Sequence, residues 1–259
     1  MAPWSRATTK GASLALLATL GCLSLLAADT SDPRTGVPIR YEIDASTFPA
    51  SWRGGEVNAR ATRIPRSEDA RSQRLAMAAL GRYPREVVTK HLRAVHFVGE
   101  MSFYGVPYGG TNSRDAVYIA NRGADAGFDD AFIVSTFHHE FSSILLRNNP
   151  DRFDELAWTG ANAPHARYGT GGTQAIKDGT ANTAYRAELH SAGFLNQYST
   201  SSVEEDFNTF AEALFRGDAR LWNICRQFPR VARKKDLIVA FYASLDPSLT
   251  EEFFRSLAE

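Results

Sequence analysis

The sequence predicts an α+β fold with an N-terminal mixed α/β lobe, a small sheet, one long helix and a C-terminal helical lobe. Three observations support this prediction. Residues 39–43, 94–98 and 116–120 are short runs rich in β-branched and aromatic side chains, as strands are. Residues 130–148 repeat apolar side chains at helical spacing. From residue 204 onward, only helical patterns follow.

The first 28 residues have the pattern of a secretory signal peptide. Arg6 and Lys10 precede an uncharged run that ends at the small residue Ala28. We therefore expect an exported protein, either secreted, periplasmic or held in the cell envelope. As an alternative, the segment ending at Cys22 loosely matches a bacterial lipobox, which would anchor a lipoprotein in the membrane through a lipidated cysteine. The apolar run continues past Cys22, which favours cleavage near Ala28.

The rest of the chain, residues 29–259, is predicted to form one domain. It divides into an α/β lobe at 29–148 and a loop with a helical lobe at 149–259. Removing Arg6 and Lys10 from the 29 basic residues leaves 27 against 29 acidic residues, so the rest of the chain is nearly neutral. It has no basic stripe of the kind that indicates a nucleic-acid partner. Cys225 is the only cysteine after residue 22, which excludes an internal disulfide framework.

The elements of the first half follow from local patterns. Helices are predicted at 68–81 and 84–92, and the first of them ends at a glycine. Residues 104–112 contain three glycines and one proline, which predicts a loop between two strands.

The second half begins with the helix at 130–148. One face of this helix is apolar and is expected in the core, while His139 and Ser143 lie on the other face. Residues 149–183 are predicted to be a long irregular connection. The four helices expected after it span 204–215, 218–228, 231–244 and 248–257.

The long helix carries residues suited to zinc hydrolysis. Two imidazoles one helical turn apart can bind one zinc ion, and a glutamate after the first can take a proton from a metal-bound water. His139 fits the first ligand and Glu140 fits the general base. Ser143 stands where the second imidazole belongs, and a neutral hydroxyl binds zinc poorly. The alternative is a polar helix face with a hydrogen-bonded histidine.

A further carboxylate comes from the helix at 204–215. Its apolar stripe places Glu205, Thr209 and Glu212 together on the opposite face. Glu205 is therefore positioned to face His139 across a cleft as a metal ligand. The alternative is an acidic first turn that complements the helix dipole, with Ser201 or Ser202 as the cap.

Two motifs together resemble a family of bacterial zinc-binding metallopeptidases that are often exported lipoproteins. They are Phe137-His138-His139-Glu140-Phe141-Ser142-Ser143-Ile144-Leu145 and the later run Gly193-Phe194-Leu195-Asn196-Gln197-Tyr198-Ser199-Thr200-Ser201-Ser202-Val203-Glu204-Glu205-Asp206-Phe207. The resemblance spans roughly residues 74–216. It implies a zincin-like fold, a zinc cofactor, and a peptide or protein substrate. It also implies His139 and Glu205 as metal ligands and Glu140 as the catalytic base.

Ser143 departs from the family pattern, which has a histidine there. Loss of one of three ligands weakens zinc binding by orders of magnitude unless another group substitutes. His138, on the same helix, is the tentative substitute, and His190 is a second candidate. The resemblance also implies that the strand at 116–120 is the edge strand that holds an extended peptide by main-chain hydrogen bonds.

Two functions follow as hypotheses. The first is an exported zinc-dependent metallopeptidase-like hydrolase in which Glu140 activates a metal-bound water at a degenerate site. The second is a catalytically inactive zincin-like protein, a pseudoenzyme that binds a peptide or a partner in the cell envelope. A structural envelope protein, similar to the family only in architecture, is a third possibility.

Overall fold

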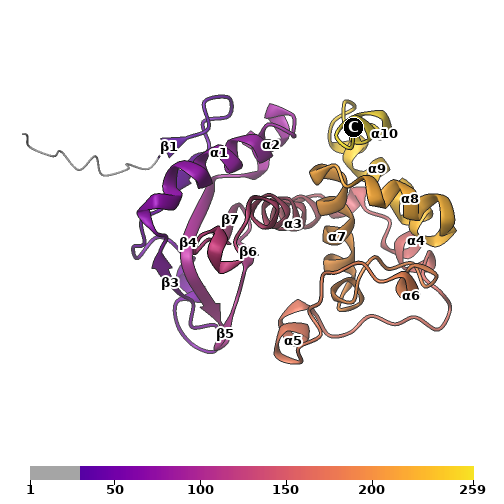
Figure 1. Ribbon diagram of the computed structural model, residues 1–259, viewed down its shortest axis with the longest axis horizontal. Coiled ribbons are helices and arrows are strands. Elements are labelled where there is room, and N and C mark those ends of the chain that lie inside the picture. Colours follow the sequence, from indigo (N-terminus) through magenta and orange to yellow (C-terminus); the bar gives the residue numbers. More distant parts are fainter. Residues whose placement is uncertain (1–29) are drawn as a thin grey trace, which may run out of the picture.

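The computed structural model describes residues 30–259, so the predicted signal peptide at 1–28 and Cys22 lie outside the described residues. This part of the chain has an α+β fold with a mixed sheet of seven strands and ten α-helices (Figure 1). None of its helices is both long and apolar enough to cross a membrane. The predicted α+β class is therefore confirmed.

The sheet runs in the order β1, β2, β4, β7, β6. These strands span Thr30–Ser31, Pro38–Arg40, Ala94–Phe103, Ala116–Ala120 and Gly110–Asn112 respectively. The short strands β3 (Arg60–Arg63) and β5 (Val106–Pro107) pair with the far end of β4. β4 and β7 are parallel, whereas β6 is antiparallel to β7.

The segment predicted as a loop differs from expectation. Residues 104–112 contain β5 and β6, so the prediction of an uninterrupted loop was wrong. β7 is a strand as predicted, but it lies between β4 and β6. The expectation that 116–120 forms the edge strand is therefore corrected, and β6 takes that place. The residues of β6 have no strand pattern of their own, and the strand is defined by its hydrogen bonds to β7.

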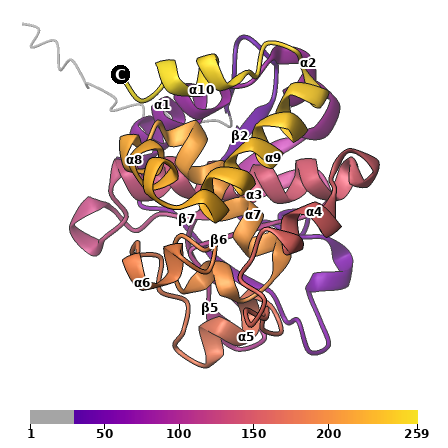
Figure 2. The ribbon, with the colours of Figure 1, turned by 90° about the vertical axis from the view of Figure 1, so that its right-hand side faces the viewer.

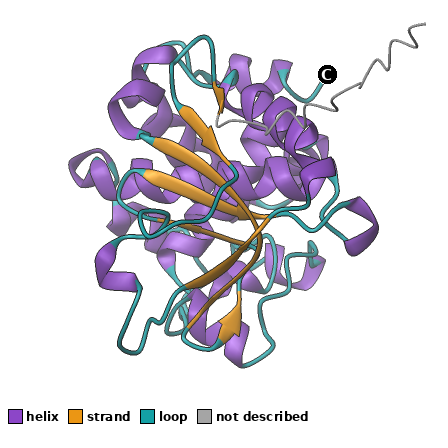
Figure 3. Cartoon of the chain, turned by 90° about the vertical axis from the view of Figure 1, so that its left-hand side faces the viewer, coloured by secondary structure: helices purple, strands orange, loops and turns teal. Residues whose placement is uncertain are grey.

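Three helices cover one face of the sheet. They are α1 (Asp69–Leu80), α2 (Arg85–His91) and α3 (Asp130–Asn148), and all agree with the predicted ranges to within one or two residues. Figure 3 shows the sheet in front of a layer of helices. The other face of the sheet packs Phe103 and Tyr118 against Phe48 and Trp52 from the segment before β3.

The second half is helical (Figure 2). Its helices are α4 (Glu155–Gly160), α5 (Gly172–Lys177), α6 (Ala187–His190), α7 (Val203–Arg216), α8 (Ala219–Gln227), α9 (Pro229–Leu245) and α10 (Glu251–Ser256). The last four match the predicted helices, whereas α4 and α5 interrupt the stretch predicted to be irregular. Short 3₁₀ turns lie at Ala50–Trp52, Arg66–Glu68, Ala124–Ala126, Pro150–Arg152 and Tyr198–Thr200.

One apolar core joins both halves of the described chain. Phe137 and Phe141 of α3 belong to the same buried cluster as Phe207 and Phe210 of α7. α3 therefore packs against the sheet on one side and α7 on the other, which brings its polar face to the junction of the two lobes.

Candidate functional site

Local capping fixes the two helices that carry the site. The Asp129 side chain accepts a hydrogen bond of 2.7 Å from the Phe132 amide and begins α3. The Ser202 side chain accepts one of 3.1 Å from the Glu205 amide and begins α7. Ser202, one of the two serines given as a cap in the alternative to a metal-ligand role for Glu205, is thus the cap, and it places Glu205 in the first turn of α7.

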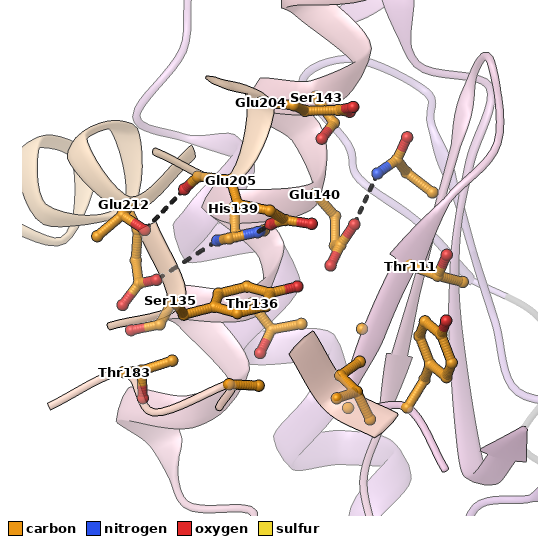
Figure 4. A pocket seen from close by; sticks show the side chains of 18 of the residues that line it. Thr111, Ser135, Thr136, His139, Glu140, Ser143, Thr183, Glu204, Glu205 and Glu212 are labelled. Carbon is orange, nitrogen blue, oxygen red and sulfur yellow. Dashed lines mark hydrogen bonds and ion pairs between the residues drawn. The ribbon is translucent and has the colours of Figure 1, made fainter. Parts of the chain in front are cut away.

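A cleft of about 500 Å³ lies between α3, α7, β6 and the segment that contains α5 (Figure 4). Apart from one histidine, the charged side chains that line it are all acidic. The acidic residues are Glu140, Glu204, Glu205 and Glu212, and the histidine is His139. No lysine or arginine of the described chain lines the cleft.

His139 is held between two carboxylates in the cleft. Its Nε2 lies 2.8 Å from Glu205 Oε2, and its Nδ1 lies 3.7 Å from Glu212 Oε2. Burial alone would lower the pKa of His139, but the hydrogen bond with Glu205 and the nearby carboxylate of Glu212 outweigh burial and raise it well above its ordinary value. The ring also stacks against Tyr198, with centroids 6.0 Å apart. The predicted meeting of His139 and Glu205 across the cleft is present in the structure.

Glu140 faces the cleft beside this pair. Asn112 Nδ2 of β6 donates a hydrogen bond of 2.6 Å to Glu140 Oε2. Burial raises the pKa of Glu140 to about 7, although His139 and Asn112 oppose this shift. β6 comes so close that a Cβ atom at Gly110 would lie 2.7 Å from Glu140 Oε1. Only glycine allows the edge strand to lie directly over this carboxyl group.

The Ser143 side chain makes a buried hydrogen bond with another helix. Its Oγ accepts a hydrogen bond of 2.6 Å from Asn208 Nδ2 of α7, and both residues are buried. An imidazole side chain at this position would meet Asn208. The position of the missing imidazole is therefore part of the contact between α3 and α7.

The two spare histidines lie elsewhere. His138 is fully buried, its Nδ1 lies 3.0 Å from the Tyr83 hydroxyl, and its ring stacks on Phe215. His190 is also buried, and its Nε2 lies 3.2 Å from the Leu195 carbonyl oxygen. Neither residue lines the cleft, so the structure does not bring His138 or His190 to the His139–Glu205 pair.

These donors can be tested against zinc, which catalytic sites hold with three protein ligands and an open position. His139 Nε2 and Glu205 offer two. Glu212 approaches the other ring nitrogen, so it supports the ring and does not share a metal with Nε2. Within residues 30–259, no group of three or more His, Cys, Asp or Glu side chains is arranged to hold a metal ion. The residues present do not fit a three-ligand zinc site.

Sequence reasoning missed two residues of the site. Asn112 was in the segment predicted as a loop, and no local signal assigned its side chain to Glu140. Asn208 did carry a signal, because it lies three residues after Glu205 and one turn before Glu212 on the same helix. Helical spacing could therefore have placed Asn208 near the face of α7 that carries Glu205 and Glu212, although not beside Ser143.

Searches with this chain found no matching protein-family model, no matching curated protein and no matching solved structure. The resemblance to zinc-binding metallopeptidases stays a prediction that rests on the two sequence motifs described above.

Proposed function

We propose that this is an exported peptide-binding protein with a metallopeptidase-like cleft in which the His139–Glu205 ion pair takes the place of a catalytic metal. The observation that carries the proposal is the hydrogen bond between Ser143 and Asn208. It fills the position of the second metal ligand with a buried contact between helices, and no other described histidine reaches the cleft. The occupant is a peptide or an extended segment of a partner protein.

The edge strand supplies main-chain groups for such an occupant. The Ala120 amide donates to the Gly109 carbonyl, and the Ser113 amide donates to the Ala116 carbonyl. Hydrogen bonding alternates along an antiparallel pair, so the amide and carbonyl groups of Gly110 and Asn112 point away from β7. An extended chain can add to β6 through these groups.

Charge selects among peptides. Among the described residues, four glutamates and one histidine line the cleft, whereas Arg147 and Arg216, which pair with Glu204 and Glu212, are not among the lining residues. A peptide that carries lysine or arginine gains attraction there, whereas an acidic peptide is repelled. We therefore expect basic peptides to bind more tightly than acidic peptides of the same length.

The test combines metal content with peptide binding. The full chain is purified without chelator, and its zinc content is measured by mass spectrometry. Fluorescent peptides that differ only in lysine or glutamate at alternate positions are then titrated by anisotropy. We expect substoichiometric zinc and at least about tenfold tighter binding of the lysine peptides. Stoichiometric zinc that is lost in both His139→Ala and Glu205→Ala would overturn the metal-free assignment, and no binding of either peptide would overturn the peptide-binding assignment.

A second candidate is the zinc-dependent hydrolase that the motifs imply. The observation that favours it is Glu140, whose pKa of about 7 suits a group that accepts and returns a proton near neutral pH. This candidate requires stoichiometric zinc together with peptide cleavage that is lost in Glu140→Gln. Zinc content and cleavage by the unmodified protein therefore separate the two candidates.

A further inference from the structure

The segment around α5 is a short helix between two glycines that both adopt positive φ. Gly171 has φ of +111° and Gly179 has φ of +68°, and no atom lies near the place where a Cβ would stand at either residue. Glycine adopts such angles without strain and loses little when they change. The segment 171–179, which we call the lid, therefore has a flexible joint at each end.

The lid contacts the opposite wall of the cleft. The hydroxyls of Tyr108 and Thr173 lie 2.7 Å apart, and Lys177 Nζ lies 5.8 Å from the centroid of the Tyr104 ring. Tyr104 is presented by the tight turn between β4 and β5, where it adopts φ of +54° and is 43% exposed. Figures 1 and 2 both show α5 beside β5. These two contacts, which we call the latch, are polar and lie near the surface.

The inner side of the lid covers the ion pair. A Cβ atom at Gly172 would lie 2.2 Å from Glu205 Oε1 and 2.5 Å from the Tyr198 hydroxyl. The absence of a side chain at this position thus lets the lid rest on the His139–Glu205 pair. Thr173 and Ile176 of the lid also line the cleft. In this conformation the lid closes the side of the cleft that faces β5.

We propose that the lid is a gate, which opens by rotation at Gly171 and Gly179 when the latch breaks and so controls access to the cleft. Tyr108 lies two residues before β6, so an extended chain that pairs with β6 and continues past Gly109 meets the contact between Tyr108 and Thr173. One neutral hydrogen bond contributes about 1 kcal/mol, so its loss raises the open population about fivefold. The inference rests on the proposed function only in naming a peptide as the occupant that enters.

Thiol labelling tests the gate without a peptide. In a full chain that carries Cys22→Ser and Cys225→Ala, Thr136→Cys places a reporter on the floor of the cleft, and Leu156→Cys provides a control site. Leu156 is 85% exposed on α4 and does not line the cleft. Both proteins are reacted with a maleimide, and the second-order rate constants are compared.

We expect the Thr136→Cys reporter to react at least about tenfold more slowly than the control. Tyr108→Phe and Thr173→Val should each accelerate the reporter about fivefold. The two together should act no more strongly than either one, because they remove the same hydrogen bond. The control rate should not change. A reporter that reacts as fast as the control, or one that neither latch variant accelerates, overturns the gate.

Amide hydrogen exchange provides a second measurement in the protein without added cysteines. Exchange in residues 172–177 should be about fivefold faster in Tyr108→Phe than in the unmodified chain, with α3 unchanged. Equal exchange in the two proteins overturns the gate. Because neither experiment uses a peptide, a faster reporter together with no peptide binding would leave the gate in place and reject the proposed function alone.

Discussion

Glu205 and Asp206 are neighbours on α7, yet their carboxylates enter opposite environments. Glu205 pairs with His139 in the cleft, where the two side chains are 17% and 13% exposed. Asp206 pairs with Lys234 of α9, and both of those side chains are 0% exposed. Asp206 Oδ2 also accepts hydrogen bonds of 3.0 Å from Trp158 Nε1 and 2.6 Å from the Tyr168 hydroxyl.

The two ion pairs differ in burial, and we infer that the buried pair stabilises the fold whereas the pair in the cleft is available to a ligand. Asp206 gathers partners from α4, from α9 and from the connection before α5, so its pair holds the helical lobe together around the start of α7. Burial raises the pKa of Asp206 and lowers that of Lys234, and their mutual attraction opposes both shifts. The His139–Glu205 pair instead lines the cleft, beneath the lid. A ligand in the cleft can reach the His139–Glu205 pair, whereas no ligand can reach the buried Asp206–Lys234 pair.

The largest expected effect is on the buried pair. Asp206→Asn leaves the Lys234 ammonium buried without a counter-charge, which should lower the free energy of unfolding by about 3–5 kcal/mol. The double variant Asp206→Asn with Lys234→Met should be more stable than Asp206→Asn alone. Urea denaturation followed by circular dichroism measures both. If the double variant is less stable than the single one, the buried charge is not the cause.

Zinc affinity offers the next largest change, in the cleft. Ser143→His alone should gain little zinc affinity, because Asn208 occupies the space of the new ring. Ser143→His with Asn208→Ala should gain at least about 100-fold, since His139, Glu205 and the introduced imidazole then supply three ligands.

Competition with a chromophoric chelator measures this affinity, and Asn208→Ala alone is the control. A single Ser143→His variant that binds zinc as tightly as the double one would show that Asn208 does not block the position.

His96 shows what burial does to the pKa of a histidine that has no carboxylate partner like Glu205 among the described residues. Burial lowers its pKa from 6.5 to about 4, with Arg40 adding to the shift and Asp44 opposing it. The unfolded chain therefore binds this proton more readily than the folded chain, and stability is lost as the pH falls from 6.5 toward 4.

Between neutral pH and pH 5 the loss from His96 should be about 2 kcal/mol. Urea denaturation across this range should give a flatter pH profile in His96→Gln than in the unmodified chain. An unchanged profile would assign the acid sensitivity to other groups.

The smallest expected effect is on the stability of the cleft pair. Glu205→Gln, the counterpart of Asp206→Asn one residue away, should lower the free energy of unfolding by about 1 kcal/mol, because the amide oxygen still accepts a hydrogen bond from His139 and the ring can lose its proton. It should still weaken binding of the lysine peptides, because it removes a charge from the cleft. A loss of stability as large as that of Asp206→Asn would remove the distinction between the two pairs.

Much of the helical framework was predictable from the sequence. Apolar spacing places α3 and α7 within a residue or two, and a serine cap was expected at Ser201 or Ser202, because both signals are local to the helix. The same spacing turned Glu205 toward the cleft. The His139–Glu205 meeting followed because two amphipathic helices that share a core must also bring neighbouring polar faces together.

Tertiary contacts decided the rest. β6 exists because β7 pairs with it, so three residues with little strand character became the edge that touches Glu140. His138 looked available on the sequence, yet Tyr83 and Phe215, each more than 50 residues away, enclose it. The sequence by itself determined which helices form and which faces are polar, since those depend on short-range periodicity. Only the folded chain decided that Asn208 donates a hydrogen bond to Ser143 and that Thr173 of the lid contacts Tyr108, because these contacts join residues about 65 positions apart.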